Sequence, residues 1–449
     1  MKKILSLAVL LSFGKSKAFS NQIENNSIDT NITVSVMKEE IEAPIDTLTR
    51  TVSGLMDDML KLKRLKITGY VQPQFQYIDS AGAQSYAGGD FGNGSTKYTN
   101  RFTMRRARFK FTYTFEHILL MVNIDARETG LAMRETYAKI SDPWINMVSL
   151  TAGLLQTQFG FELTQSSSER ESPERARYNQ ILFPVERDLG AFGSLVVPKS
   201  SKLYGLKLDV GYMNGVAGVS PEFDSFKDYT GRLQYSKSLK SEKAMFSVAA
   251  SYYNGGYRIG TQKDYNFNTL ANGDKGFEFA SDTANYNRKA RKEYMGADVQ
   301  TSFEWPIGIT TVRAEYIQGI QPGTNESNQR ANNSLAALPT KPIYHRQFNG
   351  AYFYLIQDIG TSRFQVVAKY DWFDPNVKIS GEAIGKTGTG TNLGDVRFDT
   401  YGFGLNFRIN SYAKVMAYYD YVTNESTSIS TVKKDLKDNV FTLRFQIKY

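Results

Sequence analysis

From Leu65 to the end of the chain, apolar and polar residues alternate with a period of two. Successive side chains of a β-strand point to opposite faces, so each such segment has one apolar and one polar face. The alternation recurs in many segments that end in Tyr, Phe or Trp, among them 65–77, 106–115, 206–212, 363–372, 401–409 and 413–421. Membrane-spanning strands need ~9–11 residues and carry aromatic residues near both membrane surfaces. The pattern therefore predicts strands that cross a membrane.

The final strand carries the clearest version of this pattern. Its apolar face consists of Phe441, Leu443, Phe445, Ile447 and the terminal Tyr449. Such an ending resembles the C-terminal recognition strand of bacterial outer-membrane barrels. The 385 residues from Leu65 onward contain roughly 16 such segments, and bacterial barrels have an even number of strands. Side chains cannot fill a barrel of that width. We therefore expect an all-β, transmembrane antiparallel barrel with a water-filled lumen, surrounded by the lipid of the bacterial outer membrane.

A helical period precedes the barrel. Between Pro44 and Arg64, apolar residues are spaced alternately three and four positions apart, at Ile45, Leu48, Val52, Leu55, Met59 and Leu62. This spacing is the heptad seam of a coiled coil, and Pro44 suits a first helical turn. Two interpretations remain open. The helix could lie on the barrel as an amphipathic element, or three copies could form a periplasmic bundle, which would accompany a homotrimer.

The N-terminus has the layout of a secretory signal peptide. Lys2 and Lys3 precede an apolar core at 4–13, and small residues such as Ala18 and Ser20 follow. The predicted parts are thus a signal peptide (1–20), a polar segment with a periplasmic helix (21–64) and the barrel (65–449). Removing residues 1–20 lowers the net charge from +9 to +5. This mild charge does not favour a nucleic-acid partner, which binds a concentrated basic face.

The second predicted strand carries a row of positive charges. Arg106, Arg108 and Lys110 alternate with the apolar residues that start at Ala107. Charges facing lipid are costly, so these three residues are expected to line the lumen. Arg105 has the opposite phase, but a bulge or loop at the strand end could turn it inward. The alternative is that these charges only pair with lumen acids such as Asp125 and Glu135.

Residues 158–190 form a second basic segment. They are too long and too charged for a strand or tight turn, and long ordered loops are usually functional. The segment contains Arg170, Arg175, Arg177 and Arg187 together with five glutamates. Folded into a wide barrel, this loop would narrow the pore. The alternative is an ordinary outer loop stabilised by its own salt bridges.

Several short strings at these places resemble the phosphate-selective porins O and P, especially the Bacteroidetes-type members. The strings are RRARF (105–109), FGFE (159–162), ERESPERAR (169–177), ERDLG (186–190) and YDWFDPN (370–376). The resemblance implies a trimer of 16-stranded barrels with an inward-folded third loop and a constriction of arginines. It matches the strand-two arginine pair to Arg105 and Arg106, and the constriction-loop arginine to Arg175. It also implies that small anions such as phosphate pass the pore.

The sequence departs from the family where Leu163 replaces the lysine of the phosphate-specific members. General anion preference is therefore a better expectation than tight phosphate specificity. With Arg105, Arg106, Arg108, Lys110, Arg170, Arg175 and Arg177 as expected pore-lining residues, the function we expect is an anion-leaning diffusion channel. A general nutrient porin and a structural or adhesive barrel are the alternatives.

An enzyme is not expected. The chain has no cysteine, which excludes disulfides and thiolate metal sites, and it has only two histidines. Neither His117 nor His345 stands in a recognisable catalytic triad or metal motif. We therefore expect no catalytic residue, no metal and no cofactor.

Overall fold

The computed structural model describes residues 48–128, 130–216, 218, 221–239, 243–281, 285–329 and 339–449. The predicted signal peptide and most of the polar segment that follows it lie outside these residues. The chain divides between Lys63 and Arg64 into two units. The helix covers residues 48–64, and its seam residues Leu48, Val52, Leu55, Met59 and Leu62 are exposed in the single chain. Among the described residues, no helix is long and apolar enough to cross a membrane.

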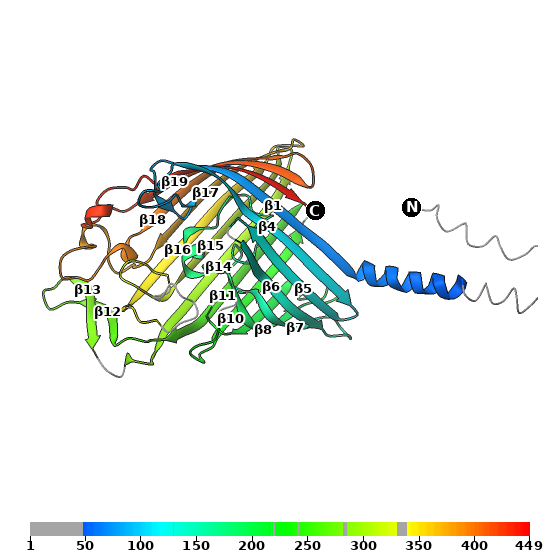
Figure 1. Cartoon of the computed structure of the whole chain (residues 1–449), viewed down its shortest axis with the longest axis horizontal. Coiled ribbons are helices and arrows are strands. Elements are labelled where there is room, and N and C mark those ends of the chain that lie inside the picture. The colour runs from blue at the N-terminus through cyan, green and yellow to red at the C-terminus, as the bar shows by residue number, and fades with distance from the viewer. Residues whose placement is uncertain are drawn as a thin grey trace, which may run out of the picture. The chain divides into compact units, whose positions relative to one another are not determined.

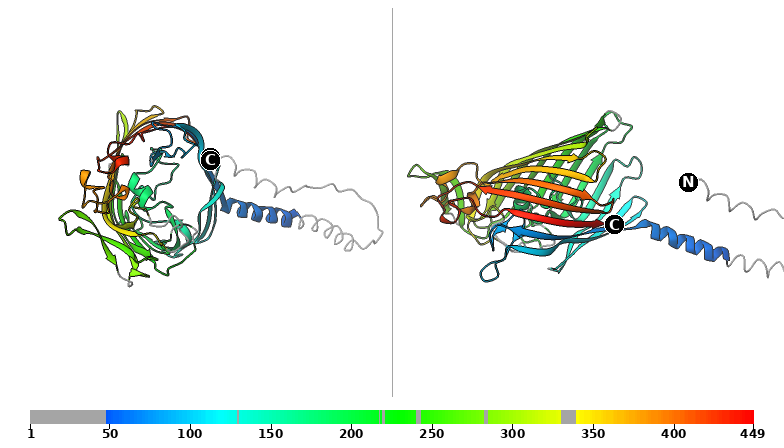
Figure 2. Two further views of the ribbon diagram at one scale, coloured as in Figure 1. Left: turned by 60° about the vertical axis from the view of Figure 1, so that its left-hand side comes forward. Right: turned by 90° about the horizontal axis from the view of Figure 1, so that it is seen from above.

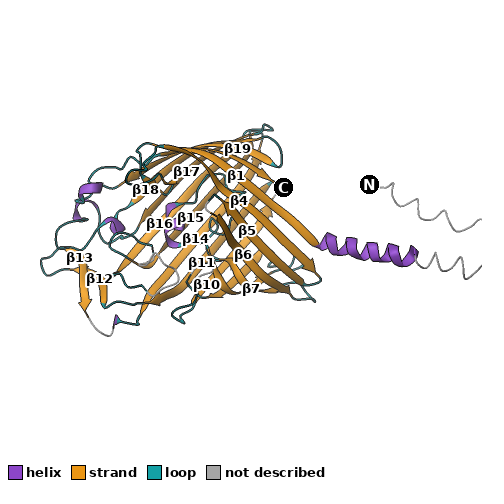
Figure 3. Cartoon of the chain, viewed as in Figure 1, coloured by secondary structure: helices purple, strands orange, loops and turns teal. Residues whose placement is uncertain are grey.

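In the described residues of the second unit, sixteen strands form one closed antiparallel barrel (Figures 1 and 3). They are β1 (Leu65–Ile78), β4 (Asn100–Phe115), β5 (Ile118–Arg127), β6 (Gly130–Ser141), β7 (Val148–Gln156), β8 (Arg187–Val196), β9 (Leu206–Met213), β10 (Asp228–Leu239), β11 (Ala244–Arg258), β14 (Lys289–Trp305), β15 (Gly308–Gly323), β16 (Ile343–Asp358), β17 (Phe364–Asp374), β18 (Phe398–Arg408), β19 (Ala413–Asn424) and β20 (Val440–Lys448). Each strand pairs with its neighbour in the chain, and β1 pairs with β20 to close the ring. The predicted fold and strand number are confirmed.

Smaller elements lie in the loops. They are β2 (Gln84–Ser85), β3 (Gly89–Asp90), β12 (Lys263–Thr269), β13 (Lys275–Ser281), α2 (Arg177–Leu182), η2 (Gly381–Ala383), η3 (Leu393–Asp395) and η4 (Ser430–Val432). The β12–β13 hairpin joins the barrel sheet through a short parallel pairing with β16. The third loop, which contains α2, runs from the end of β7 to the start of β8 and so covers residues 157–186. It ends four residues earlier than predicted, because Arg187 to Gly190 already belong to β8.

The barrel reverses the burial pattern of a soluble protein. In β20 the apolar residues Leu443, Phe445 and Ile447 are 36–42% exposed, whereas Arg444 and Gln446 are only 2–3% exposed. A contiguous exposed apolar surface is unfavourable in water but is the outer band of a transmembrane barrel. The period of two therefore places apolar side chains toward lipid and polar side chains toward the lumen.

The two ends of the barrel differ in the length of their connections. Short turns, such as residues 116–117 between β4 and β5, lie at the end that holds Leu65 and Tyr449. Long segments, such as 157–186 and 375–397, lie at the opposite end. In outer-membrane barrels the short turns are periplasmic and the long loops are extracellular. The third loop therefore enters the lumen from the extracellular side, and Figure 2 (left) shows it inside the ring of strands.

Candidate functional site

A β-bulge in β4 gives the lumen two consecutive arginines. Gln72 of β1 faces Arg106, but the next residue, Pro73, faces Met104, so Arg105 is the extra residue. Proline has no backbone N–H to donate, which favours an interruption of the ladder there. Arg105 Nε donates to Oε1 of Glu174 at 2.7 Å, and Arg106 Nη2 lies 3.5 Å from Oε2 of the same carboxylate. Arg105 therefore faces the lumen through a bulge inside β4 rather than at the end of the strand.

Glu174 of the third loop is the centre of this cluster. Besides Arg105 and Arg106, it accepts a hydrogen bond from Arg444 Nη2 of β20 at 3.0 Å. Burial alone would raise the pKa of Glu174, but Arg105 and Arg106 outweigh it and hold this pKa well below its ordinary value. The carboxylate therefore remains ionised and ties the loop to both sides of the β1 strand.

A second bulge acts in the same way on the neighbouring hairpin. Asn123 of β5 faces Glu135, but Ile124 faces Met133, so Arg134 is the extra residue. Arg134 Nη2 lies 3.2 Å from Oδ2 of Asp125. Leu131 and Met133 before the bulge and Ile140 after it all face outward, so Arg134 and Glu135 both face the lumen.

Asp125 also neighbours two other arginines. Arg127 Nε lies 3.5 Å and Arg108 Nε 4.0 Å from its Oδ2 atom. Arg187 of β8 pairs with Glu135 at 3.0 Å. Arg108 thus lies on the lumen face of β4 and near Asp125. Lys110 continues the row toward the periplasmic end and is exposed.

The third loop crosses the lumen and contacts strands around the ring. Tyr354 of β16 donates to Glu162 Oε1 at 3.0 Å, and Lys414 of β19 donates to the Arg170 carbonyl at 3.0 Å. Aromatic side chains fasten the loop on one side, where the rings of Tyr178 and Tyr352 stack at 6.4 Å. The expected inward-folded loop is therefore present, and it brings the two basic segments of the sequence together.

The arginines of this loop have different surroundings. Arg175 is buried within the loop, donates to the Glu162 carbonyl at 2.9 Å and pairs with Glu186. Burial and the charge of nearby Arg170 hold the pKa of Arg175 well below its ordinary value. Arg177 lies 3.6 Å above the ring of Phe398, on the side toward the outer loops.

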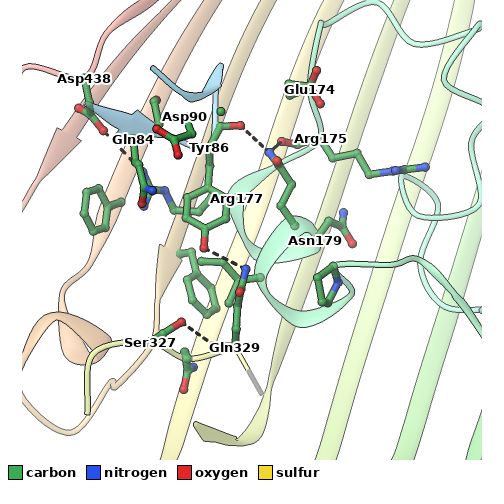
Figure 4. Close-up of a pocket in the computed structure, with 18 of the residues that line it drawn as sticks. Gln84, Tyr86, Asp90, Glu174, Arg175, Arg177, Asn179, Ser327, Gln329 and Asp438 are labelled. Carbon is green, nitrogen blue, oxygen red and sulfur yellow. Dashed lines mark hydrogen bonds and ion pairs between the residues drawn. The ribbon is translucent and has the colours of Figure 1, made fainter. Parts of the chain in front are cut away.

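The first extracellular loop, residues 79–99, also narrows the lumen. Gln180 of α2 donates to the carbonyl of Tyr86 at 2.8 Å, and Gln329 donates to the hydroxyl of Tyr86 at 3.1 Å (Figure 4). Arg177 lies 4.8 Å above the ring of Tyr86. Nothing in the glycine-rich sequence of this loop predicted that it folds inward.

Between these loops and the strands lies a cavity of about 890 Å³. Five of the seven expected residues line it: Arg105, Arg106, Arg170, Arg175 and Arg177. Arg108 and Lys110 lie outside it. Among the described residues, no group of three or more His, Asp or Glu side chains could hold a metal ion. His117 lies in the turn between β4 and β5, whereas His345 of β16 contacts Asp264 at 2.7 Å at the opposite end.

No family model matches this chain, and no curated protein sequence does either. Among solved structures, OmpF of Salmonella typhi in complex with daunomycin superposes with a TM-score of 0.53 at 10% identity, over 86% of this chain and 97% of that chain. The outer membrane channel DcaP of Acinetobacter baumannii has a TM-score of 0.48 at 14% identity, over 86% and 97%. A loop-deletion mutant of OmpT of Vibrio cholerae has a TM-score of 0.49 at 10% identity, over 86% and 99%. The likeness to OmpF shows that this chain has the fold of an outer-membrane porin.

Proposed function

We propose that the protein is a porin-type diffusion channel of the outer membrane that favours anions at its constriction. One observation carries the proposal. Five guanidinium groups gather where the third loop crosses the lumen, and in the described part of the chain only two carboxylates, Glu174 and Glu186, form ion pairs with them, while Glu162 also lies near Arg175. Arg105, Arg106 and Arg444 bind Glu174, Arg175 pairs with Glu186, and Arg170 lies close enough to interact with its neighbours' charges.

This excess of positive charge suits anion passage. Low-dielectric walls focus the field of a few fixed charges and raise the local concentration of counter-ions. Guanidinium groups hold oxyanions through paired, charge-assisted hydrogen bonds. Fast flux requires binding sites that are moderate and several in number, and the row of arginines on β4 and the third loop meets this requirement.

The resemblance to porins O and P supports an anion channel but gives limited support to phosphate specificity. Leu163, which stands in place of the lysine of the phosphate-specific members, is completely buried inside the third loop. It offers neither charge nor donor to a permeating ion. We therefore propose that phosphate is one of several small anions that pass.

The exposed seam of the 48–64 helix supports a homotrimer. Five apolar side chains at heptad spacing leave a continuous apolar stripe on the isolated helix. Three parallel copies would bury these stripes against one another. Trimeric channels are expected to open and close in groups of three conductance steps.

Recording from the full-length protein in a planar bilayer tests the function. In a KCl gradient, we expect the reversal potential to be shifted from zero toward the equilibrium potential of chloride. A reversal potential near zero would instead indicate a general nutrient porin. The absence of stepwise conductance from folded protein would indicate a structural or adhesive barrel.

A further inference from the structure

Arg170 stands apart from the other arginines of the constriction. Its residue is only 3% exposed, and none of its three guanidinium nitrogens has a hydrogen-bond partner among the described residues. Neighbouring charges of the same sign, on Arg106, Arg175 and Arg444, interact with it. A buried charge is costly unless it is paired and hydrogen-bonded. An anion beside Arg170 would supply the missing partner.

The position of Arg170 is fixed by its backbone. The carbonyl oxygens of Ser168 and Arg170 both accept hydrogen bonds from Lys414 Nζ, at 3.2 and 3.0 Å. The side chain extends from this anchored segment to the wall of the 890 Å³ cavity that Arg105 and Arg106 also line. The guanidinium is therefore preorganised for a ligand in that cavity.

The cavity is much larger than an inorganic anion requires. Pockets for organic molecules measure roughly 300–1,000 Å³, and this cavity falls in that range. Its wall contains the apolar and aromatic side chains of Phe183, Phe373, Phe398, Ile181 and Leu393. An inorganic oxyanion would leave this apolar wall in contact with water, whereas an organic anion would cover it.

Carboxylates outnumber cations in the outer part of the cavity, where Arg177 and Lys437 also lie. In Figure 4, Arg177 of α2 lies between Asp438 and Glu174. Asp90, Glu326 and Asp438 all line the cavity. A second anionic group on the ligand would meet these carboxylates. The arrangement thus favours one anionic group at the inner end and an uncharged, apolar body toward the outer end.

We propose that Arg170 and the apolar wall of this cavity form a binding site for an organic monoanion, namely a monocarboxylate with an apolar body. The inference rests on the proposed anion channel and names the class of solute that the channel holds on its way through. Arg170 receives the carboxylate together with Arg106, and the apolar wall receives the hydrocarbon part.

Block of the chloride current by benzoate, acetate, inorganic phosphate and neutral benzyl alcohol tests the site. The measurements use the full-length channel in a planar bilayer. Burial of the phenyl ring should lower the half-blocking concentration of benzoate about tenfold relative to acetate. Benzyl alcohol, which has the ring but no charge, should block poorly. Block by benzoate no stronger than by acetate, or weaker than by phosphate, would overturn the proposal.

Variants separate the two ends of the site. Arg170→Gln should make the half-blocking concentrations of benzoate and benzyl alcohol equal. Leu393→Ser should reduce the ratio of the half-blocking concentrations of acetate and benzoate. Lys433→Gln removes one positive charge from an exposed position outside this cavity and should leave both ratios as they are. An Arg170→Gln channel that keeps the full benzoate block would contradict the site. Anion preference in the salt gradient, recorded for the unmodified channel, reports separately on the proposed function.

Discussion

Arg105 and Arg106 are consecutive in the chain, yet both guanidinium groups lie on the carboxylate of Glu174, at 2.7 and 3.5 Å. In a regular strand their side chains would point to opposite faces, one toward the lumen and one toward lipid. The bulge opposite Pro73 removes this conflict. The barrel thereby gains an additional lumen charge without an additional strand.

The first prediction concerns Arg105. Its side chain is 31% exposed, compared with 5% for Arg106 and 2% for Arg444, so it is the arginine of the Glu174 cluster most open to passing ions. Arg105→Gln should lower the chloride-to-potassium permeability ratio about twofold or more, because the fixed field weakens. The reversal potential in a KCl gradient measures this ratio. Lys433→Gln is the matched control, and equal ratios for both variants would refute the role of Arg105.

The second prediction concerns Glu174. Glu174→Gln keeps the size of the side chain but removes the negative charge that Arg105, Arg106 and Arg444 share. The uncompensated guanidinium groups should raise the chloride-to-potassium ratio, opposite in direction to Arg105→Gln. The same salt gradient measures the effect. A fall in the ratio would show that Glu174 does not compensate the pore charge.

Arg175 should respond differently from Arg105. It donates to the carbonyls of Glu162, Leu163 and Gln165 at 2.9, 3.2 and 3.3 Å, all within its own loop. Arg175→Gln leaves the carbonyls of Glu162 and Gln165 without this donor, which costs about 1–3 kcal/mol for each unsatisfied group. We expect noisy conductance from a loosened loop and a lower unfolding free energy. If the variant instead gives steady conductance and unchanged stability, and only its ion selectivity changes, Arg175 would act on the permeating ions and not on the loop structure.

The loop between β19 and β20, residues 425–439, should make the stability of the protein depend on pH through Asp438. Burial raises the pKa of Asp438 from 3.8 to about 6, although Arg177, 3.9 Å away, opposes this shift. Between about pH 4 and 6 the folded protein thus keeps a proton that the unfolded chain releases. The contribution of this group to stability is greatest below that window, falls as the pH rises through it, and is constant above it. In denaturant unfolding between pH 4 and 7, the unfolding free energy of Asp438→Asn should fall less with rising pH than that of the unmodified protein does.

The alternation of the sequence predicts the barrel because each strand needs only local information. A period of two specifies which face meets lipid. Strands in a membrane cannot leave an open edge unpaired in lipid, so the sixteen segments are expected to close into a ring. The strand-two arginines were predictable for the same reason. Arg105 needed one further inference, namely that a bulge changes the phase.

The rest of the site depends on contacts between distant segments. Arg134 has the lumen phase relative to Leu131 and Met133 but the lipid phase relative to Ile140, and the register between β5 and β6 shows where the phase changes. Tyr86 lies in a loop of glycine and polar residues whose inward fold is specified by Gln180 and Gln329, far away in the chain. No periodicity encodes such pairings, since each is a side-chain contact between loops.

The last prediction concerns the helix of residues 48–64. Leu55 lies in the middle of its apolar seam and is 61% exposed in the single chain. If three helices pack through this seam, Leu55→Asp places three carboxylates in the core of the bundle, where burial of unpaired charge is strongly unfavourable. Trimers in detergent, measured by analytical ultracentrifugation, should then dissociate at higher protein concentration than the unmodified trimer does. Ser53→Asp adds the same charge on the opposite face of the helix and should leave the trimer intact. Equal dissociation of both variants would show that the seam does not join the subunits, because an effect of charge alone would not depend on the face that carries it.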